Sequence, residues 1–516
     1  MTTAPQLVAV LDMGASAVRL VIAEIGPDRS IRIIEEASRG ILLGRDTFSS
    51  GAIRSKTIDA ALAALASFRK VIDEYGVQHL RAVATSAVRE ARNVDIVLDR
   101  IQGRTGITFD LINEAEESRL IFLAVKPAVE ARFDFQTDST LIVEVGGGST
   151  SLMLLRDGLP SRSALYALGS VRLRQQLELR RLPHDVQLAL LKRSIANVVD
   201  EIRHDVPLNR VAHVLGVGGE ARFVASQLRA DQSENVTAEV ERHAFLAFCD
   251  RLAVLDEDQI VDGFGLAAGE AEALVPSLLV YRAILAETAA TKLIISDASL
   301  RRGVLLDMAE PGGRLSAAHF EQQVLASAEA VGHKHRFDRN HGRHVAALAV
   351  QLFDEFHDEH GLSQRERLLL QVAGLLHDIG IYVSLRAHHK HSQYLLSATQ
   401  IFGLSNDETA IVSNIARYHR RGLPQKSHFP YMALDRQDRL IVNKLAALLR
   451  IANALDAEHL QKVREIRLLR RERAWILEIS GDGDLTMEQL AATARADMFA
   501  DTFGRELVIR GAGAQP

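Results

Sequence analysis

The feature that most constrains this chain is a glycine-rich turn between two apolar runs. The run LIVEV at 141–145 leads into Gly146, Gly147, Gly148, Ser149 and Thr150, and a second apolar run follows. This pattern predicts a strand, a tight turn and an antiparallel return strand. Glycines let backbone N–H groups approach an anion closely, and the two hydroxyl groups add donors. The turn by itself fits a phosphate-binding loop and an ordinary glycine hairpin equally well.

The same order of residues occurs near the N-terminus. There an apolar run precedes Asp12, Gly14 and Ser16, and another apolar run follows. Asp12 corresponds to Glu144, and both carboxylates are suited to holding a divalent cation. A repeated unit of strand, acid, turn and strand predicts two similar half-domains that face each other across a cleft. The repeat therefore favours the phosphate-binding interpretation.

A third glycine turn contains Gly216, Gly218 and Gly219, and it separates an apolar run from a helical pattern. A helix that begins at such a turn directs free N–H groups and the positive end of its dipole toward an anion. We expect this turn to contribute to the same phosphate site.

Composition limits the class of protein. The 516 residues are enough for three or four domains, and 47% hydrophobic with 25% charged residues is typical of a globular protein. No apolar run approaches the roughly 20 residues that a membrane span needs, and the N-terminus lacks a signal-peptide pattern, so a cytoplasmic protein is expected. The lone Cys249 excludes an internal disulfide. The net charge of −5 argues against unspecific binding of nucleic acid.

Changes along the chain predict four domains. Strand and helix patterns alternate through two α/β half-domains at 1–130 and 131–312, which end at a linker around Glu310–Gly313. Residues 316–465 are helical in pattern, and 14 of the 19 histidines fall between His319 and His459. Residues 466–516 predict a small α/β domain.

Two segments of the first half carry candidate catalytic groups. Arg89 lies at the expected entrance of a helix, where its guanidinium is suited to gripping phosphate. A run of acids, 114–117, begins a later helix. Acids at a helix start compensate the dipole, but one that faces the glycine turns is also placed to take a proton from water.

The histidine-rich segment suggests a metal site, because imidazole and carboxylate groups on facing helices suit several divalent ions. Alternatively, these polar residues serve a helical bundle or bind phosphate as cations. The candidate ligands are His341, His377, Asp378, His391, His419 and Asp456.

Four motifs occur in the order and spacing of one known family. They are Asp12-x-Gly14, Thr85-Ser86-Ala87-x-Arg89-Glu90-Ala91-x-Asn93, Glu116-Glu117-Ser118-Arg119-Leu120 and Gly146 to Thr150. The chain resembles the exopolyphosphatase and guanosine pentaphosphate phosphohydrolase (Ppx/GppA) family over nearly its whole length. The resemblance implies two actin-like (ASKHA, ribonuclease H-like) half-domains, an all-α HD-like domain and a small C-terminal α/β domain.

The resemblance also implies an activity, which is hydrolysis of the terminal phosphoanhydride of inorganic polyphosphate with release of orthophosphate. Glu117 would be the base that deprotonates water, Arg89 would neutralise developing charge, and Asp12 and Glu144 would hold Mg²⁺. The glycine turns would cradle the phosphates, and a homodimer is expected. A runner-up substrate is guanosine pentaphosphate (pppGpp), hydrolysed at its 5′ end, with guanosine tetraphosphate as the related ligand.

Several residues depart from the family pattern. Ala15 and Ala17 replace residues with polar side chains in the first loop, Ser151 replaces an acid after the second, and Glu220 stands where threonine is usual. Glu144 is one methylene longer than the usual aspartate. Each change removes a charge-assisted contact worth about 1.5–3 kcal/mol or places charge beside it. A third hypothesis is therefore a weakly catalytic regulator that binds polyphosphate or an alarmone. In the helical domain, Asn453 stands where the HD pattern ends in aspartate.

Overall fold

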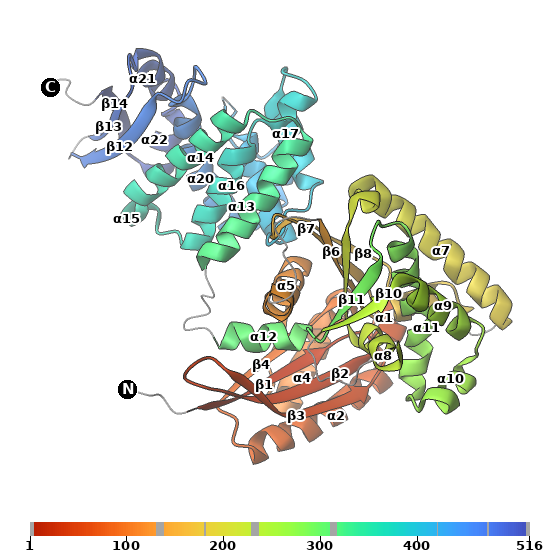
Figure 1. Ribbon diagram of the computed structural model, residues 1–516. Helices are drawn as coiled ribbons and strands as arrows, with labels where there is room; N and C mark the ends of the chain where they lie inside the picture. Colours follow the sequence, from red (N-terminus) through yellow and green to blue (C-terminus); the bar gives the residue numbers. More distant parts are fainter. Residues whose placement is uncertain are drawn as a thin grey trace. The chain divides into compact units, whose positions relative to one another are not determined.

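The computed structural model describes residues 5–130, 139–179, 182–228, 237–309, 317–420, 422–471 and 474–511. These residues form two compact units, Met1–Phe320 and Glu321–Pro516 (Figure 1). The predicted linker at Glu310–Gly313 lies outside the described residues, and the boundaries of the four predicted domains stay predictions.

The first sheet of unit 1 has the strand order β3-β2-β1-β4-β5. Strands β1 and β2 form the predicted antiparallel hairpin, in which Asp12 pairs with Arg19, while β1, β4 and β5 are parallel. The strands are β1 (Gln6–Met13), β2 (Ala17–Ile25), β3 (Ile31–Gly40), β4 (His79–Ala84) and β5 (Phe109–Leu111).

The second sheet repeats this arrangement. Its order is β10-β11-β9-β6-β7-β8, so β8-β7-β6-β9-β11 matches β3-β2-β1-β4-β5, and β10 is added at the edge. The triple-glycine turn joins β6 to β7, in which Glu144 pairs with Ser151. The predicted internal repeat is therefore confirmed. The strands are β6 (Thr140–Val145), β7 (Thr150–Arg156), β8 (Leu159–Tyr166), β9 (His213–Val217), β10 (Thr237–Glu241) and β11 (Lys292–Ser296).

The alternation of side chains along β1 and β6 determines on which face of its sheet each acid, Asp12 or Glu144, lies. In β1, Leu11 and Met13 pack into one core, while Val8 and Val10 pack into a second core with residues of α5 (Glu114–Glu130) and α12 (Leu300–Met308). Side chains of a strand alternate between faces, so Asp12 shares the face of Val10. In β6, Val143 and Val145 point into the second half's core, so Glu144 points the other way.

Helices α5 and α12 cross against the first sheet (Figure 1). Gly303 of α12 lies so close to the backbone of Leu120 in α5 that a methyl group would overlap its carbonyl oxygen. Arg119 pairs with Asp307 at 2.9 Å, and Arg81 pairs with the same carboxylate. Ser163 in β8 donates to Ser118 at 3.2 Å, so α5 contacts both halves.

The other helices of unit 1 cover the outer faces of the two sheets or connect their strands. They are α1 (Leu43–Ser50), α2 (Ser55–Glu74), α3 (Ser86–Arg89), α4 (Val94–Thr105), α6 (Ser170–Gln176), α7 (His184–Asp205), η2 (Leu208–Arg210), α8 (Gly219–Leu228), α9 (Arg242–Ala253), α10 (Glu257–Phe264) and α11 (Ala268–Ala286).

Unit 2 is the predicted helical bundle followed by a small sheet of order β12-β13-β14. The elements are α13 (Ala317–Lys334), α14 (Arg339–Glu355), α15 (His357–His360), α16 (Gln364–Leu376), η4 (Ile379–Tyr382), α17 (His388–Ser397), α18 (Asn406–Arg417), α19 (Phe429–Met432), α20 (Arg436–Ala454), β12 (Val463–Arg470), β13 (Ala474–Gly481), α21 (Thr486–Thr493), α22 (Asp497–Phe503) and β14 (Glu506–Gly511).

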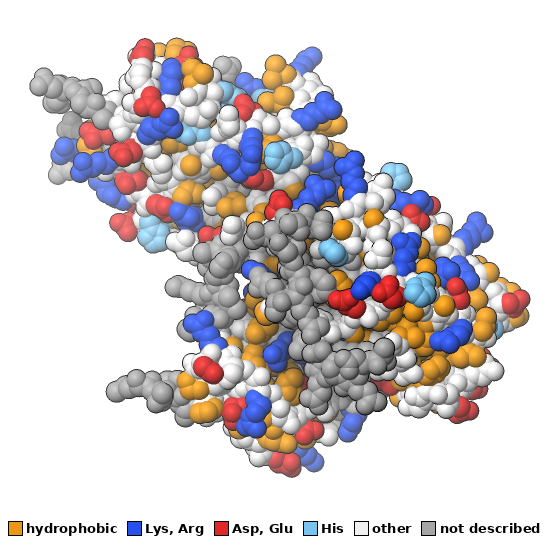
Figure 2. All heavy atoms as spheres, viewed as in Figure 1, with side chains coloured by type: hydrophobic (Ala, Val, Ile, Leu, Met, Phe, Trp, Pro, Cys, Tyr) orange, Lys and Arg blue, Asp and Glu red, His pale blue; other side chains and the backbone are white. Residues whose placement is uncertain are grey.

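Charged side chains of both signs are interspersed over most of the face shown in Figure 2. Among the described residues, no single helix is long and apolar enough to cross a membrane. The pair α10 and α11, bent by 108°, meets the length and composition requirement only when taken together.

Candidate functional site

The candidate site of unit 1 lies where the carboxyl ends of parallel strands meet. Asp12 is near the end of β1, Arg89 ends the short helix after β4, and Glu117 lies in the first turns of α5, after β5. Asn113 accepts a hydrogen bond from the backbone N–H of Glu116 at 2.9 Å, which fixes the start of α5. Ligands in α/β sheets bind at this edge because the loops there converge.

Asp12 lies between two arginines. Its Oδ2 atom is 3.4 Å from Nη1 of Arg301 and 3.8 Å from Nη1 of Arg19, and the residue is only 6% exposed. Arg19 also donates to the hydroxyl of Ser16 at 3.4 Å. The first loop therefore combines a buried carboxylate with cationic groups.

Glu117 forms an ion pair with Arg89, but burial still disfavours its charged form. Arg89 Nη1 donates to the carbonyl of Ile112 at 2.7 Å and lies 3.5 Å from Glu117 Oε2. Burial raises the pKa of Glu117 to about 7, against the effect of Arg89 and with a contribution from Asp12. Nη2 of Arg89 is buried and makes no hydrogen bond among the described residues, but it forms an ion pair with Oε1 of Glu114 at 3.9 Å. Glu117 and Arg89 together offer a base near neutrality and a guanidinium nitrogen that is not hydrogen-bonded.

Glu144 completes an acidic group that extends across both halves. Burial, followed by the charges of Glu117 and Asp12, raises the pKa of Glu144 to about 8, and Arg222 acts in the opposite direction. Buried carboxylates that repel one another are stabilised by a divalent cation, and carboxylate oxygens are the ligands that Mg²⁺ prefers. The donor set therefore fits Mg²⁺.

The glycine loops of the two halves face each other. A methyl group on Gly147 would lie 3.0 Å from the side chain of Ala15 and 3.6 Å from the backbone nitrogen of Ser16. A methyl group on Gly148 would overlap the hydroxyl of Ser86. Arg172 donates to the carbonyl of Gly148 at 2.5 Å. Only glycine permits this approach of the two loops.

Some predicted phosphate ligands lie elsewhere. The hydroxyl of Thr150 donates to the carbonyl of Leu168, and the residue is fully buried. Gly216 lies inside β9, where it pairs with Val143 and Ile295. Thr150 begins β7 and Gly216 lies within β9, so both residues belong to the second sheet. Backbone pairing extends into segments that were predicted to be loops. Ser149, by contrast, lies in the turn itself, between β6 and β7.

The third turn keeps the predicted geometry at its other two glycines. Gly218 has a φ of 123°, which strongly favours glycine, and Gly219 begins α8. Gly14 and Gly146 hold the first two turns, in which their N–H groups donate to the carbonyls of Ala17 and Ser149 at 3.1 and 2.8 Å. Those two N–H groups are therefore used within the turns.

The departures from the family pattern have structural consequences. Ala15 and Ala17 are buried, and Ala15 packs where the facing loops meet. Ser151 is also buried, opposite Glu144. Burial raises the pKa of Glu220, which faces Arg19 and Arg222. These alanines therefore support the close contact of the loops, while Glu220 adds a carboxyl group to an already acidic site.

The helical unit brings most of its predicted metal ligands together. Nε2 of His341 is 3.3 Å from Nε2 of His377, and both rings approach Oδ2 of Asp378, at 3.8 and 3.6 Å. Oδ1 of Asp378 is 3.1 Å from Nε2 of His388 and 3.3 Å from Nε2 of His419. Burial lowers the pKa of His377 to about 3. The carboxylate of Asp378 therefore lies between two pairs of imidazoles.

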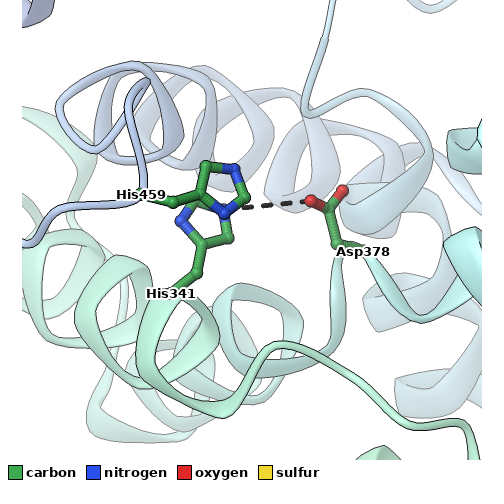
Figure 3. Close-up of side chains that lie close together, drawn as sticks. All are labelled: His341, Asp378 and His459. Carbon is green, nitrogen blue, oxygen red and sulfur yellow. Dashed lines mark ion pairs between the residues drawn. The ribbon is translucent and has the colours of Figure 1, made fainter.

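Two predicted members of this cluster behave differently from expectation. The run 388–391 presents His388 to Asp378, whereas the predicted His391 lies one helical turn away on α17. Asp456 accepts from Nδ1 of His341 at 2.8 Å, so it holds a ring instead of facing Asp378. Figure 3 shows His459, which was not predicted, stacked on His341 with ring centroids 3.6 Å apart.

Sequence reasoning missed Arg19, Arg222 and Arg301. The hairpin register pairs Asp12 with Arg19, so counting across the first turn would have found that contact. Arg222 and Arg301 reach the site from helices α8 and α12, and nothing in the local sequence signals it. His388 and His391 lie nearly one helical turn apart along α17, and the local sequence does not show which of them reaches Asp378.

Comparison with known proteins agrees with this architecture. Residues 21–311, more than half of the chain, match the model of the Ppx/GppA phosphatase family, and residues 325–494 match Ppx/GppA phosphatase, domain III. A guanosine-5′-triphosphate,3′-diphosphate pyrophosphatase of Pseudoalteromonas atlantica is 22% identical over 87% of this chain and 86% of its own. One of Vibrio vulnificus is 23% identical over 81% of each chain.

A solved structure supports the fold. The crystal structure of an exopolyphosphatase from Cytophaga hutchinsonii aligns with a TM-score of 0.54 and 23% identity, over 59% of this chain and 98% of that one. The repeated sheets of unit 1 are accordingly the two predicted actin-like half-domains, and unit 2 contains the predicted helical domain. The chain therefore belongs to the Ppx/GppA phosphatase family.

Proposed function

We propose that this phosphatase hydrolyses the terminal phosphoanhydride of inorganic polyphosphate and releases orthophosphate, with Mg²⁺ as its cation. The observation that carries the proposal is the position of Glu117, a buried carboxyl group with a pKa of about 7, beside Asp12, Glu144 and Arg89. The facing glycine loops close this site from both halves.

The residues define the chemical step. Deprotonated Glu117 accepts a proton from water as the water oxygen bonds to the terminal phosphorus, and the bond from phosphorus to the bridging oxygen breaks. The shortened chain leaves on that oxygen, and orthophosphate is the other product. Arg89 donates to the terminal phosphate from Nη2, which makes no hydrogen bond among the described residues. Positioning and electrostatic stabilisation supply most of the catalysis in such reactions.

Asp12 and Glu144 are the groups that would hold Mg²⁺, because one is a buried and the other a half-buried carboxylate near the ends of the central strands. A bound ion would neutralise part of the negative charge of the phosphate groups. Arg301 and Arg19 both form ion pairs with Oδ2 of Asp12 and stabilise its charged form.

A second candidate substrate is pppGpp. The relatives named as guanosine-5′-triphosphate,3′-diphosphate pyrophosphatases cover more than four fifths of this chain, including its helical domain. A 5′-triphosphate ends in the same phosphoanhydride, so the same residues would act on it.

One assay tests both candidates. Orthophosphate release from long-chain polyphosphate is measured with Mg²⁺, with and without competing pppGpp. We expect release that requires the cation and a kcat/KM for polyphosphate above that for pppGpp. A higher kcat/KM for pppGpp would make the nucleotide the substrate. Tight binding of either anion without any release would favour the weakly catalytic regulator.

Glu220 is expected to weaken substrate binding. Replacing it with glutamine removes a negative charge beside the phosphates, which is worth about 1 kcal/mol for a solvent-screened pair. We expect Glu220→Gln to lower KM for polyphosphate by about fivefold at pH 8. The effect shrinks as the pH is lowered, because the raised pKa of Glu220 leaves more of it neutral at lower pH. Steady-state kinetics over a pH series provide the measurement.

The matched control is Glu239→Gln on the edge strand β10. This substitution removes the same negative charge at a position outside the candidate site, and we expect KM for polyphosphate to stay unchanged. An equal fall of KM in both variants would mean that overall charge, not Glu220, limits binding.

A further inference from the structure

The start of α6 donates hydrogen bonds to every carbonyl group of the triple-glycine turn. The backbone N–H groups of residues 170–172 donate to the carbonyls of Gly146 and Gly147 at 2.9 to 3.1 Å. The carbonyl of Gly148 instead accepts from Nε of the Arg172 side chain at 2.5 Å. The first two peptide groups of the turn are therefore held by the backbone of α6, and the third is held by a side chain.

Fixing these carbonyls also fixes the opposite side of the turn. In a trans peptide the N–H group points away from the carbonyl oxygen of the preceding residue, so the N–H groups of Gly147, Gly148 and Ser149 point away from the donors in α6. Among the described residues, no acceptor receives these three N–H groups. Successive free N–H groups form a concave site for an anion. The orientation of the third donor, on Ser149, depends on Arg172.

The side chain of Arg172 also reaches the first half-domain. Its Nη2 donates to Oε1 of Glu90 at 2.6 Å, and its guanidinium carbon lies 4.0 Å from the centroid of the Phe48 ring. Glu90 directly follows Arg89, the residue that ends α3. Arg172 is only 8% exposed, so these charge-assisted contacts are made largely out of water. One buried guanidinium thus joins the glycine turn to the segment that carries Arg89.

Arginine is the side chain that makes these contacts together. Its guanidinium is planar, donates in its own plane in two directions and stacks its face on an aromatic ring. Phe48 packs against the turn as well, because a methyl group on Gly148 would lie 2.8 Å from its ring. A lysine would keep the positive charge, but its single nitrogen cannot serve both acceptors and the ring. The contact therefore depends on the shape of the group and not only on its charge.

We propose that Arg172 is a positioning residue for the phosphatase reaction. It orients the N–H group of Ser149 toward the phosphate groups of the substrate and, through Glu90, fixes the segment that carries Arg89. This role rests on the proposed function, in which the turn and Arg89 act on the same terminal phosphate. Arg172 acts through its two partners and not by contact with phosphate.

The first measurement compares Arg172→Lys with the wild type in Mg²⁺. We expect kcat for polyphosphate to fall on the order of 10²-fold, because a displacement of about 1 Å at the reacting groups has that effect. We expect the Kd of orthophosphate, measured by calorimetry without polyphosphate, to rise about tenfold as the donor on Ser149 loses its orientation.

Arg174→Lys is the matched control. Arg174 also lies on α6 and is 8% exposed, but it pairs with Glu257 and Glu272 instead of the turn. We expect this variant to keep the kcat for polyphosphate and the Kd of orthophosphate of the wild type.

Chemical rescue separates positioning from general damage to the fold. Guanidinium ion, added to Arg172→Ala well below denaturing concentrations, should recover part of the lost kcat by taking the place of the missing group. Methylammonium has the same charge without the planar shape and should not. The wild type and Arg174→Lys should respond to neither ion. Adding Glu90→Gln to Arg172→Ala should lower kcat no further, as expected for residues that act as one unit.

Orthophosphate binding and polyphosphate hydrolysis are measured separately, so the two proposals fail separately. A wild type that binds orthophosphate but does not hydrolyse polyphosphate would reject the proposed function, and the orthophosphate affinities would still decide the role of Arg172. No orthophosphate binding by the wild type, wild-type values in Arg172→Lys, or equal rescue by the two ions would overturn the positioning role. If Arg172→Ala fails to fold by circular dichroism, the lysine variants decide, and an equal loss in Arg174→Lys would also overturn it.

Discussion

The Glu117→Gln variant is expected to release orthophosphate 10²–10⁴-fold more slowly than the wild type. A positioned general base contributes about that factor, and glutamine has nearly the same shape but accepts no proton from water. Arg89 keeps its bond to the carbonyl of Ile112 in the variant, so the donor stays in place. Initial rates with saturating polyphosphate and Mg²⁺ provide the measurement, and KM is expected to change little.

Stability measurements show whether the variant is intact. Burial raises the pKa of Glu117 from 4.5 to about 7, so the folded state holds its proton more tightly than the unfolded state. The native protein therefore loses stability as pH rises from about 4.5 to about 7, and glutamine avoids this loss. In EDTA, Glu117→Gln should be more stable than wild type at pH 8 by up to about 3 kcal/mol, and equally stable at pH 4.

Urea unfolding at the two pH values measures the difference. A variant that is inactive and also less stable at pH 8 would mean that the lost rate reflects damage to the fold. A fully active variant would remove Glu117 from the catalytic role.

The second large effect is expected at Gly303. Its replacement by alanine puts a methyl group onto the carbonyl oxygen of Leu120, and backbone cannot yield in the way that a flexible side chain can. Helices α5 and α12 must separate, which costs about 3 kcal/mol of the free energy of unfolding. Glu117 lies less than one turn from Leu120, and Arg301 lies two residues from Gly303. A shift of about 1 Å at such groups lowers kcat on the order of 10²-fold.

Gly263→Ala is the matched control. Gly263 also lies in a helix, α10, but nothing lies within 4 Å of the position that its methyl group would take. Alanine there should leave kcat unchanged and add about 0.5–1 kcal/mol of stability through its better helix propensity. Thermal unfolding and orthophosphate release compare the two variants, and equal behaviour would contradict a close crossing at Gly303.

The local sequence was enough to predict the hairpins and their repeat. Apolar runs of alternating burial around Asp12 and Glu144 specify strands, and glycines between them specify the turns, because both signals depend on near neighbours. The prediction of α/β half-domains, a helical segment and a small last domain follows from the same short-range patterns. Motif spacing pointed to Arg89 and to the acids at the start of α5.

Tertiary structure alone decided which groups meet. Arg301 reaches Asp12 from a helix nearly 300 residues later, because α12 crosses α5 at Gly303. Thr150 and Gly216 lie in loop-like sequence but are taken into the second sheet, where backbone pairing extends beyond the apolar run. His388 and not His391 meets Asp378, because His388 begins α17 and His391 lies nearly one turn further along that helix. The local sequence determines the periodicity of each helix and strand, whereas the residues that each element contacts depend on how distant elements pack.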